Sequence, residues 1–104
     1  MRRAMPKLYD LAHCRAGDKG NTSILSVIAY RAEDYPRLAA AVTVEAVRRH
    51  LAGVVHGDIR RWELPHLNAL QFVCDGALAG GVTTSLAIDA HGKTLSYALL
   101  EMEV

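Results

Sequence analysis

The sequence has few cysteines, almost no excess charge of one sign and no long hydrophobic run. Its 104 residues hold two cysteines, Cys14 and Cys74, which are too few for a disulfide framework. A formal net charge of +1 is too small for a protein that binds nucleic acid through contacts along the phosphate backbone. No apolar run approaches a membrane span, and no apolar core follows the basic pair at the start, as a secretion signal requires. We therefore expect a cytoplasmic protein that binds neither nucleic acid nor a membrane.

Metal-binding and nucleotide-binding motifs are also missing. The five histidines show no His-x-x-x-His spacing, and there is no Cys-x-x-Cys pair. Gly92-Lys93-Thr94 resembles the end of a phosphate-binding P-loop, but Ala87 occupies the position of that motif's first glycine. His13 and Cys14 are neighbours, so on a strand their side chains point to opposite faces and form no catalytic dyad. We therefore expect no metal, no cofactor and no cysteine nucleophile.

The composition that is present is typical of a globular protein. Hydrophobic residues make up 51% of the chain and charged residues 22%. A chain of this length buries enough apolar surface to fold without a disulfide or a metal. We therefore predict a single domain over residues 1–104.

Apolar periodicity and turn residues predict the elements of that domain. A strand over 7–12 leads into a polar loop over 15–21, and a second strand follows over 22–30. Asp34 and Thr43 are predicted helix N-caps. The remaining predicted elements are helices over 38–41 and from 44 to Gly53, a strand over 54–64, a helix over 66–79, and a hairpin of strands 82–88 and 95–104 joined by a turn at 89–93. This order predicts an α+β fold, a two-layer sandwich with helices on one face of a mostly antiparallel sheet.

The loop from Arg15 to Asn21 is the best candidate for chemistry. Within it, Gly17 and Gly20 bracket Asp18-Lys19 and permit positive φ, so successive N–H groups would form a concave nest for an anion. Lys19 would act as a point charge and Arg15 as a fork on a phosphate, carboxylate or oxyanion, and Asp18 would orient Lys19 or act as a base. The alternative is an ordinary tight turn between two strands.

Two further segments allow a functional and a structural interpretation. Small residues run from Gly76 to Gly81, where a ligand or another backbone would approach closely; the alternative is a helix end followed by a turn. Trp62 beside Arg60 and Arg61 is typical of an interface hot spot, and the alternative is a half-buried core tryptophan.

Several blocks of the sequence resemble a known family. They are Leu11-Ala12-His13-Cys14-Arg15-Ala16-Gly17-Asp18-Lys19-Gly20-Asn21-Thr22, Trp62-Glu63-Leu64-Pro65, Gly76-Ala77-Leu78-Ala79-Gly80-Gly81-Val82-Thr83-Thr84-Ser85-Leu86 and Asp89-Ala90-His91-Gly92-Lys93-Thr94-Leu95. In this order and spacing they resemble the C-terminal domain of the acyclic terpene utilisation protein A family, which also occurs as a short stand-alone chain.

That resemblance implies a ferredoxin-like fold. It also implies a larger partner domain, associated with breakdown of acyclic terpenes and related branched acids through acyl-CoA intermediates. The family pattern reads Arg-Ser-Gly-Asp-Lys-Gly-Asn, and Ala16 replaces its serine here. The matching residues define the candidate site, with catalytic roles for Asp18 and Lys19. The candidate ligand-binding residues are Arg15, Gly17, Gly20, Asn21, Thr22, Gly80 and Gly81.

Three functions are consistent with these residues. The first is a small accessory subunit that docks on a separately encoded large subunit and completes its acyl-CoA site without being a self-sufficient enzyme. The second is a stand-alone, hydratase-like enzyme in which Asp18 and Lys19 transfer protons on an acyl-CoA. The third is a ligand-binding module that forms homo-oligomers through exposed sheet edges.

Overall fold

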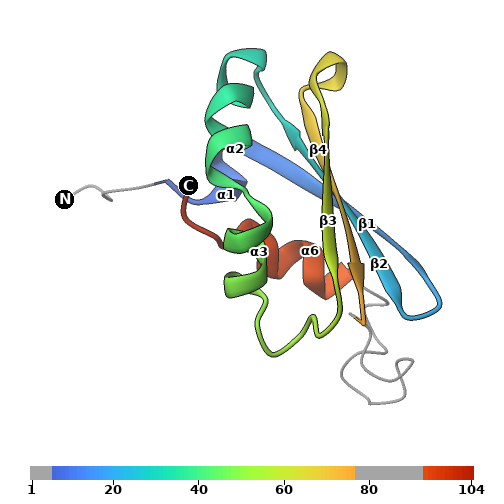
Figure 1. Ribbon diagram of the computed structural model, residues 1–104. Coiled ribbons are helices and arrows are strands. Elements are labelled where there is room, and N and C mark those ends of the chain that lie inside the picture. Colours follow the sequence, from blue (N-terminus) through green and yellow to red (C-terminus); the bar gives the residue numbers. More distant parts are fainter. Residues whose placement is uncertain (1–5, 77–92) are drawn as a thin grey trace.

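The described part of the chain folds into one antiparallel sheet with helices beside it (Figure 1). The structure is a computed structural model that describes residues 6–76 and 93–104, without the side chains of Asp18, Lys19, Lys93 and Thr94. The elements follow in the order α1 (Leu8–Leu11), β1 (Ala12–Lys19), β2 (Thr22–Ala29), η1 (Ala32–Asp34), α2 (Tyr35–Ala41), α3 (Val44–His50), β3 (Ile59–Leu64), η2 (Pro65–Leu67), β4 (Ala69–Asp75) and α6 (Lys93–Leu100).

The sheet has four strands in the order β1-β2-β4-β3, and every neighbouring pair is antiparallel. Figure 1 shows all the labelled helices on one side of this sheet. The architecture is therefore the predicted α+β two-layer sandwich. We call the side on which none of the described helices lies the open face.

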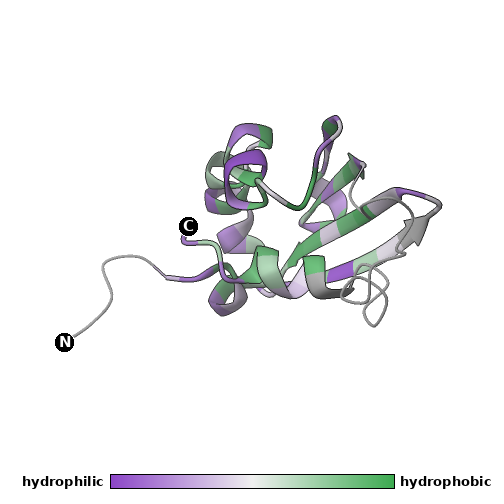
Figure 2. Ribbon diagram, turned by 90° about the horizontal axis from the view of Figure 1, so that it is seen from below, coloured by the Kyte–Doolittle hydropathy of each residue, from purple (hydrophilic) through white to green (hydrophobic). Residues whose placement is uncertain are grey.

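Alternating burial explains why the strands form a layered structure. Along β2 every second residue is buried, from Ser23 through Leu25 and Val27 to Ala29, and the residues between are partly exposed. Figure 2 likewise shows hydrophobic residues interrupted by hydrophilic ones along the strands. The buried set faces the helices, as a period of two requires. The largest fully buried side chains are Phe72, Leu8, Leu25, Leu38, Leu51, Leu70 and Leu99.

The two predicted helix starts are confirmed. Thr43 is the N-cap of α3, and its Oγ1 accepts a hydrogen bond from the Ala46 amide at 3.1 Å. Asp34 occupies the N-cap position of α2, with proline in the first turn and no side-chain cap bond.

The end of α2 is held by a side chain of the sheet. Arg61 from β3 donates to the carbonyls of Ala39 and Val42 at 2.8 and 2.9 Å, which satisfies acceptors at the end of α2.

The predicted strand over 7–12 is wrong. Residues Leu8–Leu11 form the short helix α1, and the strand begins only at Ala12. Leu8 is fully buried, and the Lys7 amide donates to Asp10 Oδ2 at 3.0 Å, which closes the first turn. Local capping therefore prevails over the weak strand pattern of this segment.

The predicted helix over 66–79 is also wrong over residues 66–76, and its last three residues lie outside the described part of the chain. Pro65–Leu67 forms the turn η2, and Ala69–Asp75 forms β4 between β2 and β3. Burial of Leu70, Phe72 and Cys74 has a period of two, although their spacing with neighbouring apolar residues also fits a helix. Pairing with strands on both sides decides between these two patterns.

The predicted C-terminal strand is the third error. Lys93–Leu100 is the helix α6, whose buried Leu95 and Leu99 are one turn apart and which packs against β1. The alternation read in this segment also places residues at a helical spacing of four. The proposed partner strand over 82–88 lies outside the described residues.

Candidate functional site

The segment predicted as a polar loop is mostly strand. Arg15, Gly17, Asp18 and Lys19 belong to β1 and pair in register with β2, from Arg15 opposite Ser26 to Lys19 opposite Thr22. An extended, paired backbone does not form the concave nest of N–H groups that we expected. Two glycines in a polar segment indicated a loop, but cross-strand pairing extends the ladder to the turn itself.

Only Gly20 and Asn21 form the turn of this hairpin. Gly20 has φ of +64°, and Asn21 is not among the residues with positive φ. A two-residue hairpin with positive φ at its first position favours glycine there, as in type II′ turns. The turn alternative of the sequence analysis is therefore correct for these two residues.

The strand conformation separates the two residues expected to act together. Asp18 lies opposite Ser23, which is fully buried beneath the helices, whereas Lys19 lies opposite Thr22 on the open face. Neighbouring strand positions belong to opposite faces. Positions 15, 17 and 19 share the open face, so the backbone groups Lys19 with Arg15 rather than with Asp18.

A hydrogen-bonded pair from two distant strands fixes the base of the hairpin. Thr22 pairs with Asp75, and its Oγ1 donates to Asp75 Oδ1 at 3.0 Å. Arg60 approaches the other carboxylate oxygen at 3.5 Å. Asp75 was not predicted as a site residue, because the apolar spacing around it predicted a helix over 66–79. The Asp75-Gly76 dipeptide after an apolar run is a strand-to-turn signal that identifies this position.

Close backbone packing joins a third segment to the same end of the sheet. The Gly57 amide donates to the Asp75 carbonyl at 2.9 Å, and the Asp75 amide donates to Asp58 at 2.8 Å. Gly76, with φ of +66°, follows directly. Because the end of β4 pairs with the start of β2, Gly76 lies beside the β1–β2 hairpin. Gly76 is the first residue of the small-residue segment that runs to Gly81. Gly80 and Gly81 lie outside the described residues.

The glycines of this corner give a matched pair of substitutions. A Cβ at residue 57 would lie 2.6 Å from the Asp75 carbonyl oxygen, whereas a Cβ at residue 17 would meet no atom of the described residues within 4 Å. We expect Gly57→Ala to lower the free energy of unfolding by about 1–3 kcal/mol, because the backbone must shift. Gly17→Ala should change it by less than about 0.5 kcal/mol. Urea denaturation measures both, and equal stability of the two variants would contradict the packing described here.

The two cysteines have the properties of buried thiols. Burial, with a smaller contribution from Cys74, raises the pKa of Cys14 from 9.0 to about 12. Burial first, and then the charge of Asp75, raises the pKa of Cys74 to about 11, with Arg48 acting against them. Cys14 packs against the core. The exposed His13 lies on the other face, where the centre of its ring is 5.4 Å from the centre of the Tyr30 ring. Neither thiol is activated by the neighbouring histidine.

This environment predicts slow thiol chemistry. At pH 8 the thiolate fraction of Cys14 should be about a thousandfold below that of a free cysteine, given the shift from 9.0 to about 12. The folded protein should therefore react far more slowly with a thiol-disulfide reagent than the same protein in urea. Rapid reaction of the folded protein at pH 8 would contradict the burial of these thiols.

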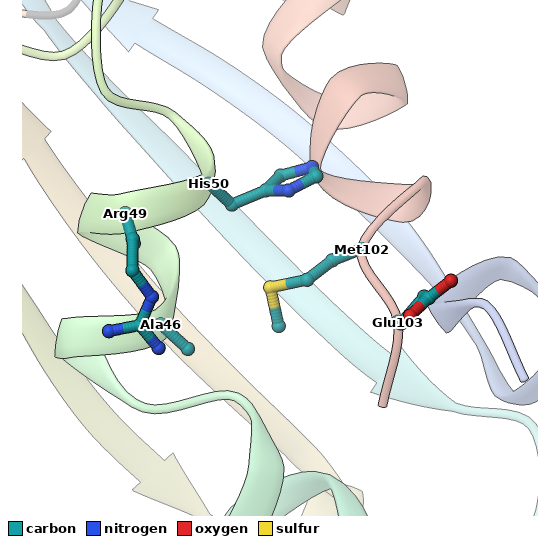
Figure 3. Close-up of a pocket in the computed structure, with 5 residues that line it drawn as sticks. All are labelled: Ala46, Arg49, His50, Met102 and Glu103. Carbon is teal, nitrogen blue, oxygen red and sulfur yellow. The ribbon is translucent and has the colours of Figure 1, made fainter. Parts of the chain in front are cut away.

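A shallow cleft of about 280 Å³ lies between α3 and the segment after α6, and is lined by Ala46, Arg49, His50, Met102 and Glu103. Figure 3 shows Met102 extending towards α3, whereas the Glu103 carboxylate points away from Arg49. The His50 ring lies 2.7 Å from the Ala98 carbonyl and so bridges α3 to α6. None of the residues predicted to bind a ligand lines this cleft.

The described residues contain neither a metal-ligand cluster nor a membrane-spanning helix. Within 6–76 and 93–104, no group of three or more His, Cys, Asp or Glu residues is placed to hold a metal ion. In the same part of the chain, no helix is long and apolar enough to cross a membrane.

The described elements form an α+β domain with helices beside a four-stranded antiparallel sheet. Residues 6–104 match the AtuA ferredoxin-like domain, so the chain belongs to that family. No curated protein and no solved structure gave a significant match.

Proposed function

We propose that this chain is an accessory subunit or companion domain that docks on a separately encoded large subunit. Together they would process acyl-CoA substrates in the breakdown of acyclic terpenes and branched acids. The segment from Gly17 to Asn21 would bind an anionic group of the substrate. Membership of the AtuA ferredoxin-like family over residues 6–104 supports this setting.

The observation that carries the anion-binding role is the group of cationic positions at the hairpin. Arg15 and Lys19 occupy open-face positions of β1, opposite Ser26 and Thr22. Arg15 is exposed, and its guanidinium has no hydrogen-bond or ion-pair partner among the described residues. A guanidinium and an ammonium near a turn are suited to a phosphate, a carboxylate or a thioester oxygen that develops charge.

The base of the hairpin supports this role, because a binding group works best when its backbone is held in place. The Thr22–Asp75 hydrogen bond and the pairing of β2 with β4 hold the first residue after the turn. Ser23, fully buried, donates from Oγ to the Gly17 carbonyl at 3.5 Å and links the strands beneath the turn. The backbone that carries the cationic positions is therefore held in place by hydrogen bonds on both sides of the turn.

Co-purification from the native cell tests the proposed assembly. We expect the tagged chain to bring down a larger chain in stoichiometric amount, identified by mass. A Phe72→Ala variant, in which the buried core is damaged, serves as the control for recognition of the folded domain. A wild-type chain that is always recovered alone, or only as a homo-oligomer, would contradict the proposal.

A further inference from the structure

Gly17 lies inside a paired strand, at a position where the described fold does not require a glycine. It pairs in register with Ile24 of β2, and it is not among the glycines with positive φ. A Cβ at this position would meet no atom of the described residues within 4 Å. A glycine inside a strand weakens the strand, and it often marks a place where a ligand approaches the backbone closely. Binding therefore explains this glycine better than folding does.

Two cationic positions flank Gly17 on the same face of β1. Successive residues of a strand alternate between its two faces, so Arg15, Gly17 and Lys19 share the open face. Each cationic position is about 7 Å from Gly17 along the strand, at the usual rise per residue. A group that lies over residue 17 is therefore within reach of an arginine and a lysine at these two positions.

Side-chain donors without a partner lie in one row with Arg15. Ser26 is opposite Arg15 on β2, and Gln71 is opposite Ser26 on β4. These three side chains are exposed or partly exposed, and none of them has a hydrogen-bond or ion-pair partner among the described residues. A guanidinium, a hydroxyl and an amide in one row can donate to the oxygens of an anion.

Asp75 occupies the donors on the other side of the hairpin. The Thr22 hydroxyl directs its proton at Asp75 Oδ1 at 3.0 Å, and the Arg60 guanidinium lies 3.5 Å from the other carboxylate oxygen. A hydroxyl has one proton to donate, so that of Thr22 is engaged within the chain. The free donors of this part of the face therefore lie towards β1, at Arg15 and Ser26.

We infer that a phosphoryl group lies directly on β1 over Gly17, between Arg15 and Lys19, with the Ser26 hydroxyl as a further donor. The inference rests on the proposed function and names the group that its anion site takes. A phosphate monoester carries about −1.5 to −2 charges at pH 7, which matches two cationic positions better than a carboxylate with a single charge. Coenzyme A carries such a monoester. The absence of a side chain at residue 17 lets the phosphoryl oxygens approach between the two cations.

Replacing Gly17 by valine separates a role in binding from a role in folding. A β-branched residue suits an extended strand, so the variant should unfold at the same urea concentration as wild type or at a higher one. The same side chain would occupy the space over residue 17, so coenzyme A should bind the assembled complex at least about tenfold more weakly. Val73→Ile is the control, because it adds bulk to the same row two strands away and should bind within about twofold of wild type.

Removing a donor and changing the anion test the rest of the site. Ser26→Ala should weaken coenzyme A binding by about tenfold, because one hydrogen bond to a charged group is lost. Ser26→Thr keeps the hydroxyl and should bind within about threefold of wild type. Inorganic phosphate should displace coenzyme A from the wild-type complex at a lower concentration than acetate does, in buffers of equal ionic strength. Isothermal calorimetry measures all of these affinities.

The outcomes distinguish failure of this inference from failure of the proposed function. If Gly17→Val bound coenzyme A like wild type, or unfolded at a clearly lower urea concentration, the inference would be overturned and the proposed function would stand. Wild-type binding by Ser26→Ala would remove that hydroxyl from the site, and equal displacement by acetate and phosphate would remove the phosphoryl group. A wild-type complex that binds no coenzyme A would overturn the proposed function as well.

Discussion

Replacing Phe72 by alanine is expected to lower the free energy of unfolding by about 3–5 kcal/mol. Phe72 is fully buried on the inner strand β4, opposite Leu25 of β2 and Arg61 of β3. Truncation leaves a cavity under the helix layer that strands on both sides prevent from collapsing. A domain of this size is stable by about 5–15 kcal/mol, so the loss is a large fraction of the total.

Urea denaturation followed by circular dichroism measures this loss. Leu67→Ala is the matched control, because Leu67 in η2 is 64% exposed and should cost less than about 0.5 kcal/mol. If Phe72→Ala unfolded at the same urea concentration as Leu67→Ala, β4 would not be an inner strand of the core. The result therefore also tests the strand that replaces the predicted helix.

Replacing Lys19 by alanine is expected to weaken binding of coenzyme A to the assembled complex by at least about tenfold. A hydrogen bond from a charged group contributes about 1.5–3 kcal/mol, and Lys19 occupies a position of the proposed anion site. The substitution should leave the stability of the domain nearly unchanged, because it lies beside the turn. Isothermal calorimetry with coenzyme A as the probe measures the change.

Two variants make that experiment specific. Lys7→Ala removes a lysine whose Nζ pairs with Glu101 at 3.4 Å, away from the hairpin, and should bind coenzyme A like wild type. Asp18→Asn tests the separation of the two faces: since position 18 lies opposite the buried Ser23, we expect little effect on binding. Normal binding by Lys19→Ala would remove this residue from the site.

The class of fold could be predicted from the sequence, whereas the identity of several elements could not. Strand β2 carries a strong local signal in its β-branched residues, the start of α3 carries one in the capping side chain of Thr43, and the start of α2 carries one in the proline of its first turn. These predictions are confirmed. β4 and α6 have apolar spacings that fit both periods. Their structures depend on pairing partners far away in the sequence, which local patterns do not contain.

The candidate site was predicted in part. The positions of Arg15 and Lys19 and the turn at Gly20 follow from local chemistry and from the family pattern. The separation of Asp18 from Lys19 follows once this segment is a strand rather than a loop. The face on which each of them lies depends on the register of β1, and a turn misplaced by one residue would exchange the two faces. The contacts of Asp75 with Thr22 and Gly57 join three distant segments, so they emerge only once the strand order is known.

The most direct test of the account compares coenzyme A binding by three samples: this chain alone, the larger chain alone, and the two assembled. The account predicts that the assembled pair binds at least about tenfold more tightly than either chain. It also predicts that Lys19→Ala in the pair returns the affinity to that of the larger chain alone. If the larger chain alone bound coenzyme A as tightly as the pair, the hairpin would complete no site, and the central claim would be wrong.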